Sequence, residues 1–408
     1  MGPIVLNYNL GEFIPYLIYL LIGLFFGSVL EMAGFGSSRK LAAQFYFRDM
    51  TVLKVMFGAI VVAMVLIFWA SSAGLLDYNL VWVNPTYLWP GIVGGLIMGA
   101  GFIIGGFCPG TSLVSMATLK IDGLFFALGT LFGIFLFGES VDLFEGFWNS
   151  SYMGRFTLPE LFGADAGVVV VLVVLMALGM FLGAEKLESI FGEKTALQAP
   201  RIRFAGGGAL FLAAAGLIIV GQPTNADRWA RLEAEKEPLL ANREVYIHPG
   251  EMLEIMHNER LIIVPLDVRE EGDYNVFHLE DARLTAFEEL EDLAASFLLN
   301  PENTIYVVMS NDERGAEEAW RVLAAEKVPN IYILEGGLNH WLEVFALPEI
   351  LLEQTSAAEG SDQLRYDFAA AVGDRHPLAD PDPHAYTLEY TPKVKLELNS
   401  GPAGGGCG

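Results

Sequence analysis

The sequence predicts an α-helical membrane domain of about six transmembrane helices, followed by a small soluble α/β domain. Three observations predict this class: long apolar runs fill residues 14–221, charged residues crowd into the remainder, and strand and helix patterns alternate over residues 245–346. The chain has 408 residues, of which 53% are hydrophobic, and this total is close to that of a soluble domain. The distribution of apolar residues along the chain therefore carries the prediction.

Six apolar segments are long enough to cross a membrane, because a helix needs about 20 apolar residues to span the hydrocarbon core. The predicted spans are residues 13–33, 52–73, 87–107, 123–144, 166–184 and 204–221. Buried helices of a soluble protein are the alternative, but residues 168–182 contain no polar side chain, and six such runs exceed one soluble core. The first run lacks a basic region and a cleavage site, so we expect a retained helix and not a signal peptide.

Basic residues beside the spans predict the orientation of the chain, because cytoplasmic loops carry an excess of Lys and Arg. The loops after the first, third and fifth spans hold this excess, whereas the opposite loops hold only Arg155. The residues in excess are Arg39, Lys40, Arg48, Lys54, Lys120, Lys186, Lys194, Arg201 and Arg203. We expect a multi-pass protein of the inner membrane with both termini, and hence the soluble domain, on the extracytoplasmic side.

Charge and motif content exclude several classes of function. A net charge of -25 argues against binding of nucleic acid, which requires a basic face. The six histidines lie outside the membrane half and have no cysteine partners at zinc spacing, so no metal site is expected. The sequence has no G-x-x-x-x-G-K-[ST] motif, so it predicts neither ATP hydrolysis nor a cofactor.

An internal repeat is indicated by glycines that recur 72 positions apart. Gly34-Phe35 aligns with Gly106-Phe107, and Gly36 therefore aligns with Cys108. Chance matches of small residues are common in membrane helices, but the combined pattern favours a duplication. Transporters are often built from such repeats, with substrate sites where the repeats meet. We expect each repeat to contain a short re-entrant helix after its turn.

Residues 105–112, which read GGFCPGTS, form the most informative segment of the membrane half. Glycines permit a sharp turn, and Pro109 suits the first position of a helix. A helix that begins there points its free N–H groups toward an anion, and the soft thiol of Cys108 suits an anion that contains sulfur. The alternative is that Cys108 is a small buried hydrophobic residue.

The candidate substrate-binding residues follow from these two turns. They are Cys108, Gly106, Gly110 and Thr111 in the second turn and Gly36, Ser37 and Ser38 in the first. Glu31 is a further candidate, because charges at the ends of apolar spans tend to be functional, although it could simply lie at the membrane interface.

The segment GGFCPGT after a glycine-rich span resembles the YeeE/YedE family of thiosulfate transporters. The resemblance covers residues 14–145 and extends toward residue 221. It implies that Cys108 contacts thiosulfate near the centre of a pore, with the backbone of Gly106, Gly110 and Thr111 around it. Two features depart from the family: Gly36 stands where a cysteine is expected, and six spans are fewer than usual. A partner subunit that completes the pore is therefore an open alternative.

The soluble domain resembles rhodanese domains. Residues 266–270 (LDVRE) match their entry motif, and residues 335–338 (EGGL) match their closing motif. A rhodanese carries its reactive cysteine in a loop between these motifs, and here that loop, residues 309–314, reads MSNDER, with Ser310 in place of the cysteine. Serine cannot hold a persulfide, so we expect no self-sufficient sulfurtransferase. The candidate residues of this rhodanese-like loop are Ser310, Arg314, Asp267 and Arg269.

The predicted domains are a membrane transport-like domain over residues 1–223, a linker over 224–244, a rhodanese-like domain over 245–350 and an acidic flexible tail over 351–408. The tail ends near Cys407, which is a candidate sulfur carrier. The alternatives for this thiol are an intermolecular disulfide or a residue without function.

The favoured function is a membrane transporter or channel for thiosulfate or a related sulfur anion. In this hypothesis the extracytoplasmic domain binds or presents the sulfur species, and no catalytic residue is predicted. The alternatives are a membrane-anchored sulfur carrier and a non-catalytic membrane subunit of a sulfur-metabolising complex. The expected partners are the sulfur anion, the lipid bilayer and a sulfur-transfer or redox protein.

Overall fold

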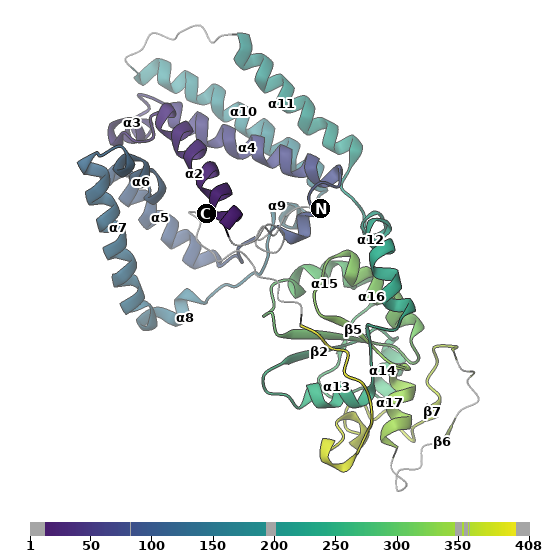
Figure 1. Ribbon diagram of the computed structural model, residues 1–408. Helices are drawn as coiled ribbons and strands as arrows, with labels where there is room; N and C mark the ends of the chain where they lie inside the picture. The colour runs from purple at the N-terminus through teal and green to yellow at the C-terminus, as the bar shows by residue number, and fades with distance from the viewer. Residues whose placement is uncertain are drawn as a thin grey trace. The chain divides into compact units, whose positions relative to one another are not determined.

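The structure is a computed structural model that describes residues 13–81, 83–192, 201–346, 353–354, 358 and 360–396. The chain divides between Gln222 and Pro223 into two compact units (Figure 1). The first is the membrane unit and the second is the α/β unit.

The membrane unit consists of helices. Its long helices are α2 (Phe13–Ala33), α4 (Thr51–Ser72), α5 (Leu88–Gly105), α7 (Ile121–Ser140), α10 (Ala166–Phe191) and α11 (Arg201–Val220), and its short ones are α3 (Ser38–Ala43), α6 (Pro109–Ala117), α8 (Glu145–Trp148) and α9 (Leu158–Phe162). Within the described residues, six helical segments are long and apolar enough to cross a membrane. Even outward-facing side chains are apolar, as at Phe13, Leu96 and Ile104, which are 78%, 71% and 88% exposed. Lipid tails suit such a surface, so the prediction of about six transmembrane helices is confirmed.

The same order of elements occurs twice in the membrane unit. A long helix, a glycine turn, a short helix and a second long helix make up both α2–α3–α4 and α5–α6–α7. Each turn contains a glycine with positive φ, +85° at Gly34 and +71° at Gly106, where a side chain would add strain. The phenylalanines that follow, Phe35 and Phe107, are buried in one apolar cluster with Leu41 and Val52. The two turns thus share a single core.

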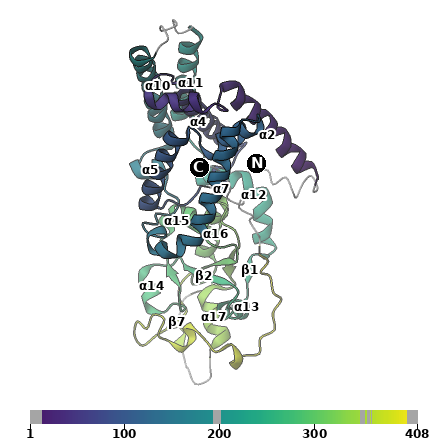
Figure 2. The same ribbon diagram turned by 90° about the vertical axis from the view of Figure 1, so that its left-hand side faces the viewer.

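A second cluster joins α4, α10 and α11, which lie side by side (Figure 2). Val65, Val174 and Leu217 are buried between these helices. Gly216 leaves room for the ring of Trp69, whose indole N–H donates to the carbonyl of Ala213 at 2.9 Å. Small and branched residues therefore bring these helices into close contact.

The α/β unit contains one parallel sheet. Its strands are β1 (Tyr246–Ile247), β2 (Ile262–Asp267), β3 (Arg283–Leu284), β4 (Thr304–Met309) and β5 (Ile331–Leu334), in the order β1-β5-β4-β2-β3. All neighbouring strands of this sheet run parallel. The prediction of a small α/β domain is confirmed.

Helices cover both faces of the sheet. They are α12 (Asn225–Ala241), α13 (Pro249–Met256), α14 (Glu271–Val276), α15 (Leu290–Phe297), α16 (Arg314–Ala325) and α17 (Gly337–Phe345). Side chains of β4 alternate between two cores: Ile305, Val307 and Met309 belong to the core with α13 and α17, and Tyr306 and Val308 to the core with α15 and α16. Burial on both faces explains why this strand is apolar throughout.

Residues 224–244, expected as a linker or a short polar helix, contain helix α12 (Asn225–Ala241), which packs within the α/β unit. The side chain of Thr224 caps α12 by accepting from the N–H group of Asp227, and Leu232 and Leu240 are buried. The amide of Asn225 donates to Glu326 Oε1 at 2.8 Å, which fixes α12 against the end of α16. The two buried leucines give this otherwise polar helix an apolar stripe, and the segment packs through that stripe.

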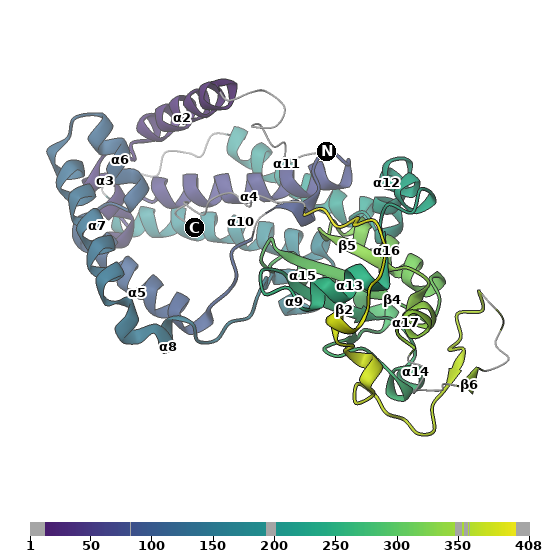
Figure 3. The ribbon, with the colours of Figure 1, turned by 60° about the horizontal axis from the view of Figure 1, so that its bottom comes forward.

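The prediction of a flexible tail is wrong for residues 360–396, which pack on the α/β core (Figure 3). Leu378 is 1% exposed, and its carbonyl accepts from the indole of Trp341 at 2.7 Å. The carboxylate of Glu251, 4% exposed, accepts from the N–H groups of Lys393 and Val394, at 2.8 Å each. A short antiparallel pair, β6 (Glu353–Gln354) with β7 (Tyr366–Asp367), precedes this contact. Isolated apolar residues that fill gaps in a preformed core leave no periodic pattern in a sequence.

Candidate functional site

Cys108 lies at the N-terminus of α6, where its thiol caps the helix. The sulfur accepts from the N–H group of Thr111 at 3.4 Å, and the hydroxyl of Thr111 accepts from the N–H group of Cys108 at 2.9 Å. This reciprocal arrangement is a capping box in which a thiol takes the place of the usual hydroxyl or carboxylate. Pro109 occupies the first helical position, as the sequence predicts. The cysteine is half-buried, so part of it remains accessible.

Gly110, two residues after Cys108, has open space at the position of a side chain. A Cβ atom at this position would have no neighbour within 4 Å. Among the described residues, no hydrogen bond reaches the N–H group of Gly110, which lies in the first turn of α6. The first-turn N–H groups of a helix need partners from outside it. An unpaired N–H donor and a thiol thus lie next to each other at a helix N-terminus.

The two turns come into contact through Gly106 and Ser38. A Cβ atom at Gly106 would lie 3.0 Å from the side chain and the carbonyl oxygen of Ser38. Ser37 caps α3 without a side-chain hydrogen bond, and Ser38 is the first residue of α3. The structure therefore brings Ser38 of the first turn against Gly106, in the turn that carries Cys108.

Gly36, which aligns with Cys108, faces an ion pair. A Cβ atom at Gly36 would lie 2.2 Å from Oε2 of Glu31 and 2.9 Å from Nζ of Lys120. Lys120 donates to the carbonyl of Gly36 at 2.9 Å and to Oε1 of Glu31 at 3.2 Å. The place that corresponds to the thiol is therefore filled by charged groups. The sequence singled out Glu31 as a charge at a span end, but it gave Lys120 only a role in orientation.

A groove of about 600 Å³ runs between α2 and α6. Its lining consists of Gly27, Ser28, Glu31, Leu113, Val114, Ala117 and Thr118. The groove reaches Glu31 from the side of α2 and lies along the helix that Cys108 caps. It does not include Cys108 itself.

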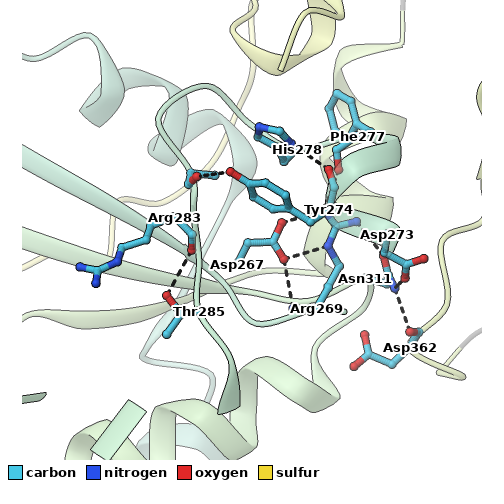
Figure 4. Close-up of polar contacts among 11 residues, drawn as sticks. Asp267, Arg269, Asp273, Tyr274, Phe277, His278, Arg283, Thr285, Asn311 and Asp362 are labelled. Carbon is cyan, nitrogen blue, oxygen red and sulfur yellow. Dashed lines mark hydrogen bonds and ion pairs between the residues drawn. The ribbon is translucent and has the colours of Figure 1, made fainter. Parts of the chain in front are cut away.

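In the α/β unit, Asp267 and Arg269 form a buried ion pair at the carboxyl end of β2 (Figure 4). Their side chains are 0% and 2% exposed, and Arg269 donates from Nη2 to Oδ2 of Asp267 at 2.7 Å. Nη1 of Arg269 donates to Oδ1 of Asn311 at 3.0 Å, and Nη2 donates to the carbonyl of Phe277 at 2.6 Å. This pair holds the loop after β4 in place and has no exposure to a substrate.

Ser310 is also buried, at 2% exposure, at the start of that loop. Its hydroxyl accepts from the N–H group of Ala316 at 3.2 Å, and its carbonyl accepts from that of Leu338 at 3.0 Å. Arg314, the first residue of α16, is exposed. The predicted loop residues thus divide into a structural set, Asp267, Arg269 and Ser310, and one accessible arginine.

Glu313 connects this loop to β5 and α12. It binds Arg243 through two hydrogen bonds, of 2.6 and 3.0 Å, and accepts from the N–H group of Gly336 at 2.6 Å. Burial alone would raise the pKa of Glu313, but the hydrogen bonds from Arg243 and Gly336 hold that pKa below its ordinary value. Glu313 is therefore anionic at neutral pH and stabilises the loop.

Asp362 is the residue of this site that the sequence did not indicate. Its Oδ1 accepts from the N–H group of Asp312 at 2.7 Å, and its Oδ2 accepts from that of Gly315 at 2.9 Å. The carbonyl of Asp362 accepts from the amide of Asn311 at 3.0 Å (Figure 4). Nothing local marks Asp362, because it is one of many acids in a segment expected to be flexible.

Cys407 lies outside the described residues. Among those that are described, no group of three or more His, Cys, Asp and Glu side chains could hold a metal ion.

These features define a multi-pass membrane protein that carries a small parallel-sheet α/β domain. Residues 32–226 match the family model described as Sulphur transport, and residues 248–344 match that of the Rhodanese-like domain. The chain is thus a fusion of a sulphur transport domain with a rhodanese-like domain, as the two resemblances implied. Comparison with curated proteins and with solved structures found no match.

Proposed function

We propose that this protein transports thiosulfate or a related sulfur anion across the inner membrane, with Cys108 contacting the anion. The observation that carries the proposal is the start of α6, where a half-buried thiol caps the helix next to Gly110, whose N–H group has no hydrogen-bond partner among the described residues. The positive end of the helix favours an anion there, and a polarisable sulfur suits one that contains sulfur. The match to the Sulphur transport family supports the same class of substrate.

The first turn contributes in a different way from the second. Ser38 lies against Gly106, and Lys120 places an ammonium group beside Gly36. A cation near the turn attracts an anion, whereas the carboxylate of Glu31 limits that attraction. In this proposal Cys108 is therefore the single thiol of the path, and the first repeat supplies charge and backbone instead of sulfur.

The rhodanese-like domain is proposed to bind or present the sulfur species on the extracytoplasmic side. Residues 248–344 contain no cysteine, since Cys108 and Cys407 are the two cysteines of the chain. These residues therefore cannot carry a persulfide on a cysteine of their own. For this reason the role proposed for the domain is binding of the sulfur species. The distribution of basic residues between the loops supports this orientation.

Uptake of radiolabelled thiosulfate into proteoliposomes tests the transport role. The decisive variant is Cys108→Ser, because serine is a good N-cap and retains the acceptor for Thr111 while it removes the sulfur. We expect uptake to fall at least about tenfold, which corresponds to about 1.4 kcal/mol. Cys108→Ala, which also removes the cap, should fall at least as far. Wild-type uptake by Cys108→Ser would remove the thiol from the mechanism.

A further inference from the structure

The loop between β4 and α16 already holds an anion, and that anion belongs to the chain itself. The N–H groups of Asp312 and Gly315, which we call the amide nest, both donate to the carboxylate of Asp362, at 2.7 and 2.9 Å. A loop at a helix N-terminus is a preferred place for a small anion. Asp362 reaches it from a segment far along the chain, so it is not part of the ordinary capping of α16.

The segment around Asp362 is fastened on both sides. Asp312 accepts from the N–H group of Gly360 at 2.9 Å and pairs with Arg365 at 3.3 Å. The N–H group of Arg365 donates to Oδ1 of Asn339 at 2.8 Å. The contacts between the loop and the segment are therefore reciprocal. The carboxylate of Asp362 accepts from N–H groups of the loop, and the carboxylate of Asp312 accepts from an N–H group of the segment.

Charge makes this arrangement exclusive. A second anion at the amide nest would meet the Asp362 carboxylate at hydrogen-bond distance, with Asp273 also bound to Asn311 at 2.7 Å. Like charges this close strongly disfavour each other in a partly buried site. A free anion and Asp362 therefore compete for the same two donors.

We propose that Asp362 is an internal competitor that closes the amide nest, and that a small sulfur oxyanion binds there only when this carboxylate leaves. The chemical class of the ligand rests on the proposed transport function, whereas the competition itself does not. The domain then has a closed state, with Asp362 in the nest, and a binding state in which the carboxylate is displaced. This arrangement regulates when the extracytoplasmic domain accepts its ligand.

Hydrogen–deuterium exchange of the full-length protein in detergent tests this proposal at residues 310–316. Asp362→Ala should speed exchange of the two amides about tenfold or more, because each loses a charge-assisted hydrogen bond. Millimolar thiosulfate should restore protection in the variant and leave the wild type unchanged. Sulfate serves as a second probe: equal restoration indicates a general oxyanion site, and weaker restoration indicates preference for thiosulfate, and both support the competition.

Two controls keep the test decisive. Asp362→Asn preserves size and removes only the charge, so it separates competition from local unfolding, and Asp367→Asn removes an exposed acid of the same segment. The proposal is overturned if neither Asp362 variant gains protection from either anion, or if the wild type gains as much. Loss of transport in Cys108 variants leaves this readout unaffected, so the two proposals can fail separately.

Discussion

Gly337 and Asp312 approach each other so closely that no side chain fits between them. A Cβ atom at Gly337 would lie 1.9 Å from the carbonyl oxygen of Asp312 and 2.6 Å from those of Asn311 and Ser310. Gly337 also has a φ of +63°, which disfavours any side chain. This contact allows the N–H groups of Leu338 and Asn339 to donate to the loop at 3.0 Å each. The closing motif of the domain thus fixes the loop that Asp362 occupies.

Gly337→Ala should unfold or strongly destabilise the α/β unit. The clash is with backbone oxygens that cannot move aside, so we expect a loss of about 3 kcal/mol or more. The measurement is limited proteolysis of the full-length protein together with its thermal unfolding. The matched control is Gly272→Ala, where a Cβ atom would meet nothing within 4 Å. Equal stability of the two variants would contradict the packing described for Gly337.

Arg269→Ala should be far more damaging than Arg321→Ala. Loss of Arg269 leaves the fully buried carboxylate of Asp267 without its cation, at a cost of about 3–5 kcal/mol. Arg321 pairs with Glu237 at 3.1 Å, but these side chains are 29% and 44% exposed, so its loss costs about 1 kcal/mol or less. Thermal unfolding of the two variants checks the difference. Similar melting temperatures would mean that the buried pair does not organise the domain.

Thr111→Val should weaken both the start of α6 and thiosulfate uptake. Valine keeps the shape of threonine but removes the hydroxyl that binds the N–H group of Cys108 at 2.9 Å, at a cost of about 1 kcal/mol. Thr111→Ser retains the hydroxyl and should retain uptake. The comparison uses initial uptake rates in proteoliposomes with equal amounts of inserted protein. Full uptake by Thr111→Val would show that the thiol does not depend on this cap.

The orientation of the chain can be read from Cys407. In a Cys108→Ala background Cys407 is the only thiol of the chain, and a maleimide that cannot cross membranes should label it in intact spheroplasts. This outcome is expected because the distribution of basic residues between the loops predicts a C-terminus outside the cytoplasm. Labelling that requires membrane disruption would reverse the predicted topology.

The α/β unit should lose stability as the pH falls below about 6.5. Burial lowers the pKa of His248, and the neighbouring His340 lowers it further, while Glu335 opposes and Lys393 adds to this shift. Tyr390, which stacks on His248, completes its surroundings. Because the unfolded chain binds a proton that the folded one resists, stability is full above the unfolded pKa and declines below it.

His248→Asn tests this titration, since asparagine can still accept from the N–H group of Gly250, which binds His248 at 3.0 Å. Between pH 7 and pH 5 the melting temperature of the α/β unit should fall less in this variant than in the wild type. His384→Asn, at an exposed position, is the control. An identical pH dependence in all three proteins would exclude His248 as a source of acid sensitivity.

The sequence by itself determined the six spans, the parallel sheet and both family resemblances. Continuous apolar runs cannot be accommodated in water, and strands buried on both faces must be apolar throughout. The local composition of the sequence therefore predicts both kinds of element. The turn at Cys108 was predictable for the same reason, because Gly106 and Pro109 restrict the backbone locally.

Only the tertiary structure decided which distant groups meet. Lys120 reaches Gly36, and Asp362 reaches the N–H groups of Asp312 and Gly315, through contacts that leave no periodic signal along the chain. A single acid in an acidic segment has the same local propensity whether it faces water or a helix N-terminus. The packing of residues 360–396 on the core determines the position of Asp362. Buried Leu378 and Glu251 fix this segment, which local sequence preferences alone would not do.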